Sequence, residues 1–443
     1  MSPSAAAFED FERLLASSAS AGIRPGLGRI SRLLHILGDP QDAWPALHVV
    51  GTNGKGSTCA FLDSVLRASG CRTAFYSSPH LDSPGERLLI DGKPLEGERW
   101  LDALRRVNVA VKRDATLAGD PPSYFELLTA TAFLLAAEGG AEVAVVEAGL
   151  GGRLDATNLL GRVLCSVVAS ISRDHMEYLG DTLEAIAGEK FAVVRPRTPA
   201  CFVGTPSALT PLFRSFCADR GALPFVLTEE ARLEDVSVTE EGCSFDFRSP
   251  RLDLKGVRTR MAGRYQLDNA ALALLALSCV REALPRVTPA SILQGMEAAR
   301  WPGRLEILSR KPLLVLDGGH NRDGVARLVE SVAELWPGLK KFGVVYAAMR
   351  DKEYGECLSL LSALHPALYA AEVPGMGRCL PAGELLEAAR NFSWGREPRA
   401  FASPLEAVRA ALEENEGVLV CGSLYLIGWI RPRLRAALGL GDV

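Results

Sequence analysis

The sequence predicts an α/β protein of two domains, a phosphate-loop domain over residues 1–298 and a smaller Rossmann-like domain over residues 299–443. An apolar run that ends in a glycine-rich turn and continues as a helical pattern indicates the first domain. A second apolar run, which ends in an acidic residue at position 147, fits the same sheet. Beyond residue 304, apolar runs alternate regularly with helical patterns, which indicates the second domain.

The composition is ordinary for a globular protein and gives no sign of a membrane or nucleic-acid role. The chain has 443 residues, 48% hydrophobic and 23% charged residues, and a formal net charge of −4. No apolar stretch is long enough to span a membrane, and the N-terminus lacks the features of a secretory signal. The 10 cysteines are scattered, without a Cys-x-x-Cys pair. We therefore expect a cytoplasmic protein with reduced thiols and no zinc site.

Two helices are predicted before the glycine-rich turn. Phe8, Phe11, Leu14 and Leu15 share one face of the first helix, and residues 30–36 suggest the second. The stretch 51–58, GTNGKGST, then follows an apolar strand pattern and begins a helix. Its glycines allow backbone N–H groups to converge on phosphate oxygens, its lysine adds a point charge, and a hydroxyl can reach a bound Mg²⁺. The glycine spacing departs from the common phosphate loop, and an ordinary tight turn is the alternative interpretation.

The middle of the chain continues the alternating pattern. The predicted strands cover residues 72–76, the two arms of a hairpin within 87–95 that turns at 91–92, 142–147 and 163–171. The predicted helices cover residues 100–112, 125–138, 182–190 and 263–282, whereas 200–260 reads only as short strands and turns. After a linker at 301–304, strands are predicted at 313–316, 342–346, 367–371 and 418–421, and helices at 324–335, 355–364, 382–389 and 404–413.

Several polar residues follow these strands, where α/β folds bind their ligands. Glu147 ends a buried strand and is a candidate Mg²⁺ ligand, and a solvent-exposed acid at a strand end is the alternative interpretation. The DGGHN stretch at 317–321 is a candidate site or a polar turn. A lone His175 is weak evidence for a metal ligand. Arg153 and Arg304 could bind a carboxylate or phosphate but could also be solvated surface charges.

The ordered motifs resemble the folylpolyglutamate synthase/dihydrofolate synthase family, the folate branch of the Mur ligases. The matching stretches run in family order along nearly the whole chain: GTNGKGST (51–58), YSSPHL (76–81), SYFE (123–126), VEAGLGGRLDATN (146–158), DH (174–175), LGDTLEAIAGEK (179–190), WPGRLE (301–306), LDGGHN (316–321) and GSLYLIG (422–428). One glycine loop would be a weak signal, whereas nine ordered motifs are highly specific. The resemblance thus implies an ATP-binding central domain of Mur-ligase type followed by a Rossmann-like ligase domain.

The resemblance also implies roles for individual residues. ATP is expected to contact Thr52, Asn53, Gly54, Lys55, Gly56, Ser57, Asn269, Arg304 and Asp317. Two Mg²⁺ ions are expected near Ser57, Ser78, Glu147 and His175. The pterin-bearing substrate is expected near Gly26, Leu27, Ser123, Tyr124, Phe125, Glu126, Gly152, Arg153, Leu154 and Asp155. The residues expected to be catalytic are Lys55, His175, Lys190 and Asp317.

Lys190 has two different interpretations. From its position alone it is a cation at a helix C-terminus that faces the helix dipole. The family resemblance instead marks it as a carbamylated lysine, although the following Phe191-Ala192 differs from the Ala-Gly pair usual there. Carbamylation requires a neutral amine, so the site would have to lower the pKa of this lysine through burial or nearby cations.

The resemblance implies a bifunctional ligase of the bacterial type that adds L-glutamate to tetrahydrofolate and to dihydropteroate through an acyl phosphate. ATP and Mg²⁺ would be required, and the protein is expected to be a monomer. Polyglutamylation alone is one alternative, because residues 24–28 lack the acidic residues that some bifunctional members carry. A nucleotide-switch ATPase or a non-catalytic binding module are alternatives of other classes. A cell-wall ligase is disfavoured because only 50 residues precede the phosphate loop.

Overall fold

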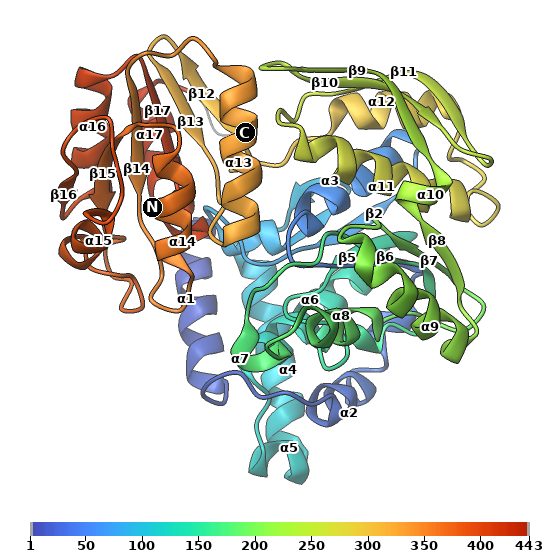
Figure 1. Ribbon diagram of the computed structural model, residues 1–443. Helices are drawn as coiled ribbons and strands as arrows, with labels where there is room; N and C mark the ends of the chain where they lie inside the picture. The colour runs from blue at the N-terminus through green and yellow to red at the C-terminus, as the bar shows by residue number, and fades with distance from the viewer. Residues whose placement is uncertain (1–2, 441–443) are drawn as a thin grey trace.

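Eight strands form the central sheet of the N-terminal domain. The structure is a computed structural model that describes residues 3–440, and Figure 1 shows its layers. The strand order is β4-β3-β2-β5-β1-β6-β7-β8, with parallel neighbours from β2 to β8 and an antiparallel hairpin at the β3–β4 edge. The strands are β1 (Ala46–Val50), β2 (Thr73–Tyr76), β3 (Leu88–Ile90), β4 (Lys93–Pro94), β5 (Val143–Glu147), β6 (Val163–Val168), β7 (Pro199–Phe202) and β8 (Leu223–Val226).

Side chains alternate between the two faces of this sheet, so each face has its own core. Leu47 and Val145 pack into the core that includes α3 (Lys55–Ala68), α11 (Tyr265–Val280) and α12 (Pro289–Ala298). Ala46 and Val146 pack toward α1 (Pro3–Ser18), α2 (Gly28–Ile36), α4 (Gly97–Arg113) and α6 (Tyr124–Glu138). The remaining helices of this domain are η1 (Pro40–Asp42), η2 (Pro84–Arg87), α5 (Ala115–Gly119), η3 (Ala156–Leu159), α7 (Met176–Leu179), α8 (Leu183–Phe191), η4 (Ser207–Leu209), α9 (Thr210–Arg220) and α10 (Leu227–Glu230).

A small antiparallel sheet covers α11 and α12 on the outside of the domain (Figure 1). It consists of β9 (Arg232–Thr239), β10 (Gly242–Arg248) and β11 (Asp253–Thr259) in the order β11-β10-β9. The prediction of only strands and turns over 200–260 was wrong for α9, whose buried Phe213 and Cys217 pack beside Phe191 and Phe202. The helix was missed because only one narrow side of α9 is apolar.

The C-terminal domain is a six-stranded sheet with helices on both faces. Its order is β12-β13-β17-β14-β15-β16, and only β12 is antiparallel to its neighbour. The strands are β12 (Glu306–Arg310), β13 (Leu313–Leu316), β14 (Phe342–Tyr346), β15 (Ala367–Ala371), β16 (Arg399–Phe401) and β17 (Gly417–Cys421). One face carries α13 (Arg322–Leu335), α14 (Tyr354–Ser362) and α15 (Ala382–Ala389); the other carries α16 (Pro404–Glu414) and α17 (Leu424–Ala437).

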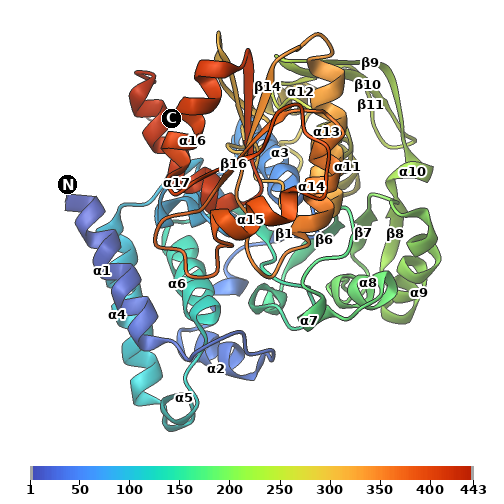
Figure 2. The same cartoon turned by 60° about the vertical axis from the view of Figure 1, so that its left-hand side comes forward.

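The predicted α/β class is confirmed, and the strands predicted in both halves form the centres of the two large sheets. Figure 2 shows the C-terminal domain, with α14 and α15, next to the N-terminal domain. The division between residues 298 and 299 stays a prediction; α12 ends at Ala298 and β12 begins at Glu306. All 10 cysteines are free, and all except Cys279 are buried. None of the helices within residues 3–440 combines the length and apolarity needed to cross a membrane.

Candidate active site

One cavity of about 840 Å³ lies where the two domains meet. The segments that follow β1, β2, β5 and β6 all line it, because the carboxyl ends of parallel strands lie at one edge of the sheet. Tyr265 and Asn269 enter from the start of α11, and Arg304, His320 and Lys352 enter from the C-terminal domain. A ligand bound in this cavity would therefore touch both domains.

The glycine-rich loop between β1 and α3 lines the cavity. Gly54 caps α3 in a left-handed conformation, with φ of +86°, and a Cβ there would lie 2.3 Å from Asn269 Oδ1. A Cβ at Gly56 would lie 2.6 Å from Nε1 of Trp301, in the connection between the domains. Lys55 Nζ donates to the carbonyl oxygens of Gly51 and Thr52, each at 3.1 Å. The loop thus places a lysine and a helix N-terminus at one point, as polyphosphate binding requires.

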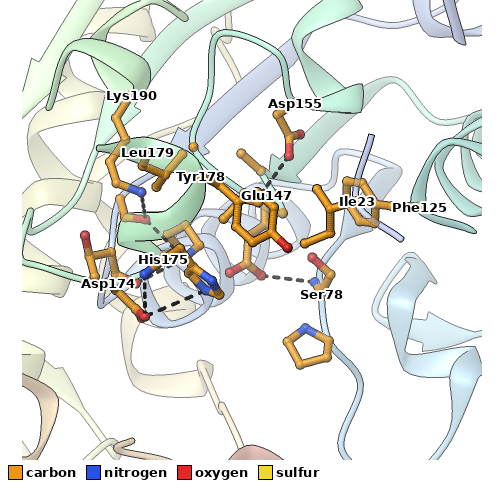
Figure 3. A pocket seen from close by; sticks show the side chains of 18 of the residues that line it. Ile23, Ser78, Phe125, Glu147, Asp155, Asp174, His175, Tyr178, Leu179 and Lys190 are labelled. Carbon is orange, nitrogen blue, oxygen red and sulfur yellow. Dashed lines mark hydrogen bonds and ion pairs between the residues drawn. The ribbon is translucent and has the colours of Figure 1, made fainter. Parts of the chain in front are cut away.

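Glu147 lies at the centre of the pocket, between Ser78 and the residues of α7 and α8 (Figure 3). It is only 5% exposed, and its Oε2 accepts a hydrogen bond from the Ser78 backbone N–H at 3.3 Å. Burial raises the pKa of this carboxyl, whereas the charge of Lys55 opposes the rise. Within the described residues, no cluster of three or more His, Cys, Asp or Glu side chains could hold a metal ion.

Lys190 reaches the same region from the last turn of α8. The side chain is buried, and its Nζ donates to the Gly51 carbonyl oxygen at 2.8 Å. Burial, and then the charge of Lys55, lower the pKa of Lys190 to about 7. The residue therefore does not point into solvent as a simple helix-end cation would.

Asp174 connects the two domains beside the phosphate loop. Its Oδ1 accepts from Lys352 Nζ at 2.6 Å, and its Oδ2 accepts from Asn321 Nδ2 at 3.0 Å. Asn321 also donates to Asn53 Oδ1 at 3.1 Å, so the DGGHN stretch contacts the phosphate loop directly. Burial alone would raise the pKa of Asp174, but interactions with His320 and neighbouring cationic groups hold it well below its usual range. Burial lowers the pKa of the adjacent His175 to about 4.

The cavity also has large apolar and aromatic side chains around Glu147. In Figure 3, Ile23 and Phe125 lie on one side of Glu147 and Leu179 on the other, and Tyr178 lines the cavity as well. Ile23 and Tyr178 are large hydrophobic residues that nevertheless remain exposed, with exposed fractions of 53% and 41%. Such surfaces at the edge of a polar cavity are suited to a flat aromatic group.

The predicted site residues fall into two groups. Those that line the cavity are Gly26, Thr52, Asn53, Gly54, Lys55, Gly56, Ser57, Ser78, Ser123, Tyr124, Phe125, Glu126, Glu147, Arg153, Leu154, Asp155, His175, Lys190, Asn269 and Arg304. Leu27, Gly152 and Asp317 are not part of its wall. Leu27 packs on the core, and Gly152 lies so close to α8 that a Cβ would be 2.8 Å from the Glu189 carbonyl oxygen.

Some cavity residues also hold the fold through hydrogen bonds and ion pairs. Asp155 accepts the backbone N–H groups of Leu150 and Thr157 at 2.8 and 2.9 Å. Ser123 and Glu126 form a capping box at the start of α6, and Glu126 also pairs with Arg29 at 3.1 Å. Arg153 pairs with Glu189 at the surface. These residues shape the substrate end of the cavity.

Asp317 stands behind the cavity wall. Its Oδ2 accepts from the Tyr265 hydroxyl at 3.0 Å and from the Leu305 backbone N–H at 2.8 Å, and its Oδ1 accepts from Gly319. Its carboxylate is therefore already bonded to groups that support the wall. The expected contact between Asp317 and the nucleotide stays a prediction.

Sequence reasoning missed several cavity residues. They are Tyr265, His320, Arg327, Lys352, Arg378 and Tyr425. Tyr265 lies within the helix predicted at 263–282, and His320 lies within the DGGHN stretch, but neither was assigned a role. Lys352 is one of four charged residues in the loop between β14 and α14, and only its ion pair with Asp174 in the folded chain distinguishes it from the others.

Comparison with known proteins agrees with this geometry. Residues 49–277 match the Mur ligase middle domain, and residues 303–424 match the Mur ligase glutamate ligase domain. The dihydrofolate synthase/folylpolyglutamate synthase of Bacillus subtilis (strain 168) is 34% identical over 97% of this chain and 99% of its own length. The protein of the same name from Escherichia coli (strain K12) is 32% identical over 91% of this chain and 90% of its own.

Solved structures give the same result. Mycobacterium tuberculosis folylpolyglutamate synthase complexed with ADP and AMPPCP has a TM-score of 0.89 at 28% identity, covering 99% of this chain and 100% of its own. E. coli FolC in complex with DHPP and ADP has a TM-score of 0.85 at 29% identity, and the match covers 99% of this chain and 100% of the FolC chain. The resemblance inferred from the ordered motifs is confirmed. The chain therefore belongs to the Mur ligase superfamily, in the folylpolyglutamate synthase/dihydrofolate synthase family.

Proposed function

We propose that the chain is an ATP-dependent ligase that joins the amino group of L-glutamate to a carboxylate of a folate, and likewise to dihydropteroate. One observation carries the proposal: a phosphate loop, a buried carboxylate and an apolar recess share a single cavity between two domains. The relatives named dihydrofolate synthase/folylpolyglutamate synthase support it, as does the related structure that holds DHPP and ADP.

The reaction has two steps. In the first, a substrate carboxylate oxygen attacks the γ-phosphorus of ATP and the bond to the β,γ-bridging oxygen breaks. ADP departs, and the substrate now carries an acyl phosphate. The glutamate amine then attacks the acyl carbon, phosphate departs, and the amine loses a proton to solvent. Lys55 and the N-terminus of α3 would neutralise the triphosphate, and Arg304 would add charge from the second domain. Closure of the domains would keep water away from the acyl phosphate.

The residues present fit Mg²⁺. The buried Glu147 carboxylate and the Ser57 and Ser78 hydroxyls offer hard oxygens, and Mg²⁺ commonly takes one or two carboxylates with phosphates and water. We expect these residues and His175 to hold two ions. When bound, Mg²⁺ would supply positive charge to the phosphates of ATP.

Lys190 is proposed to act as its carbamate. The neutral amine would attack CO₂, a nitrogen–carbon bond would form, and one proton would leave to solvent. Its pKa of about 7 leaves a substantial fraction of neutral amine near neutral pH. The product is an anion in place of an ammonium in the cavity that Glu147 also lines, and it would offer carboxylate oxygens to the water around a bound Mg²⁺.

The decisive experiment offers purified protein, ATP, Mg²⁺ and L-glutamate with dihydropteroate or tetrahydrofolate in separate reactions. We expect one ADP for each new amide in both reactions. ATP hydrolysis that ignores glutamate would instead identify a nucleotide switch, and ligation to tetrahydrofolate alone would restrict the activity to polyglutamylation. We expect an active monomer, and the free thiols fit a reducing cytoplasm.

A further inference from the structure

A second cavity, of about 320 Å³, adjoins the main one and is not used by the reaction described above. The two cavities share the residues Pro79, Tyr124, Leu424 and Tyr425. The smaller one is completed by Glu12, His80, Leu81 and Arg87. We call it the Arg87 pocket. It opens beside Ser78, which precedes Pro79 in the chain and bonds to Glu147.

Arg87 brings a buried positive charge to this pocket. The residue is only 9% exposed, and its Nε donates to His80 Nδ1 at 2.9 Å. No carboxylate oxygen of residues 3–440 lies within the 4.0 Å of an ion pair with its guanidinium. A buried charge without a counter-ion is costly, so the pocket is suited to an anionic ligand.

The nearest acids in the same loop are occupied elsewhere. Glu86 accepts the backbone N–H groups of Leu81, Asp82 and Ser83 at 2.8, 2.9 and 2.9 Å. Asp82 pairs with Arg431 at 2.7 Å. Neither carboxylate therefore neutralises Arg87.

Apart from Glu12, the other polar side chains in the wall, those of His80, Tyr124 and Tyr425, can donate hydrogen bonds. His80 Nδ1 accepts from Arg87, so its proton resides on Nε2. Burial raises the pKa of Tyr124, whose hydroxyl stays protonated. Glu12 is the one acid in the wall, and burial raises its pKa as well, against the opposing charge of Arg87.

We propose that the Arg87 pocket binds the α-carboxylate of the glutamyl residue that a folate substrate already carries. This inference rests on the proposed function. A guanidinium with adjacent N–H and O–H donors is the usual recognition set for a carboxylate. The pocket joins the main cavity at Tyr124, in the expected substrate stretch, and at Pro79, next to the reaction centre.

The pocket would then distinguish the two substrates of the enzyme. The γ-carboxylate that reacts and the α-carboxylate belong to the same glutamyl residue, so both must be placed at once. Dihydropteroate has its reacting carboxylate on a benzene ring and carries no second one. Arg87 should therefore matter for the folate reaction and be nearly irrelevant to the dihydropteroate reaction.

The test uses Arg87→Gln in the full chain, with steady-state ADP release at saturating ATP. We expect the KM for tetrahydrofolate to rise about tenfold or more, the loss typical of one charge-assisted contact, while the KM for dihydropteroate changes less than about twofold. Arg106→Gln, which breaks an exposed ion pair with Glu138, is the matched control and should change neither value. Retained dihydropteroate ligation shows that the Arg87 variant is folded.

A second measurement needs no variant. It compares wild-type KM values for tetrahydrofolate and for its analogue with an α-carboxamide on the glutamyl residue. We expect the analogue to bind about tenfold more weakly than tetrahydrofolate to the wild type, and the two compounds to bind equally well to Arg87→Gln.

Equal wild-type KM values for the two compounds would overturn the inference. A rise in the KM for L-glutamate in both reactions of Arg87→Gln would overturn it too, by assigning the pocket to the incoming amino acid. A wild type without glutamate-dependent ADP release would instead refute the proposed function, and the inference with it.

Discussion

The ammonium of Lys352 lies 2.6 Å from a carboxylate oxygen of Asp174, and this contact joins the two domains. The exposed fractions of the two side chains are 8% and 9%. Asp174 also accepts from Asn321, so one carboxylate receives two groups of the C-terminal domain. The pair thereby fixes the position of the second domain beside the phosphate loop.

Lys352→Met should remove this constraint and leave the Asp174 carboxylate without its cation. Breaking a buried ion pair by removing one partner commonly costs about 3 kcal/mol, and we expect that loss in the free energy of unfolding measured in urea. Adding Asp174→Asn to Lys352→Met should recover part of the loss, because no buried charge then remains unpaired. Additive effects of the two substitutions would contradict a direct interaction.

Lys55→Ala should abolish ligation without unfolding the protein. The substitution removes a charge from the phosphate loop, while the side chain makes only hydrogen bonds to Gly51 and Thr52. We expect kcat/KM for ATP to fall at least about a hundredfold, the loss usual for a group that stabilises transition-state charge. The melting temperature serves as the control and should change little. Near-normal ligation at saturating ATP would refute the assignment of the loop.

Glu147→Gln should raise the Mg²⁺ concentration needed for half-maximal activity. The amide keeps the volume of the side chain but removes the negative charge that a divalent cation requires. The variant should also be at least as stable as the wild type without Mg²⁺, since a buried, unpaired carboxylate is no longer present. A titration of activity against Mg²⁺ measures the first effect and thermal unfolding the second. An unchanged Mg²⁺ requirement would argue against the metal role.

Asp317→Ala should impair both stability and use of ATP. It would leave the buried Leu305 N–H and the Tyr265 hydroxyl without their acceptor, which should cost about 2–3 kcal/mol in the free energy of unfolding. Tyr265→Phe is the matched variant, because it removes the hydroxyl alone. If Asp317 acts through Tyr265, the two variants should weaken ATP binding to a similar extent. A much larger loss of ATP affinity in Asp317→Ala would indicate direct contact with the nucleotide.

Lys190→Ala should lose most ligase activity, and short carboxylic acids added to the buffer should restore part of it. The acid would replace the carboxylate that a carbamylated lysine provides. Removal of bicarbonate and CO₂ should lower wild-type activity and leave the variant unaffected. Full activity of Lys190→Ala without added acid would refute the role of the carbamate.

The pH dependence gives an independent check on Lys190. Its pKa is lowered from 10.5 to about 7, so the folded protein favours the neutral amine. For the unmodified protein, stability should therefore rise as pH increases from about 7 to about 10.5, because the unfolded chain binds the extra proton in this window. Below pH 7 the amine is mostly protonated, so the CO₂ concentration needed for half-maximal activity should increase. A CO₂ requirement that is independent of pH between 6 and 8 would contradict this account.

The local part of the site could be predicted from sequence. The glycine loop, Glu147 and the apolar strands before them form continuous stretches, and parallel strands necessarily bring their carboxyl ends together. Family resemblance added Ser78, Asn269 and Lys190, all of which line the cavity.

The long-range part of the site could not be predicted. Lys352 and Asp174 are 178 positions apart, and nothing in either neighbourhood marks the other as its partner. Asp317 shows a second limit of a linear motif. Its position after a strand suggested a ligand contact, but the structure uses its carboxylate to hold Tyr265 and Leu305. An acid in the cavity wall can be distinguished from an acid behind the wall only when the packing of the neighbouring elements is known. A linear motif does not contain that information.

The close approach of Gly56 to Trp301 links the phosphate loop to the connection between the domains. With no room for a Cβ between them, a shift of the loop on binding polyphosphate must displace the Trp301 ring or be resisted by it. If binding shifts the loop in this way, occupancy of the loop is energetically coupled to the position of Trp301 in the connection between the domains. Such coupling is reciprocal. If a small molecule traps one orientation of the domains and thereby changes the affinity for ATP by some factor, then bound ATP changes the affinity for that small molecule by the same factor. An inhibitor of this enzyme could therefore act at the domain connection without competing for the nucleotide.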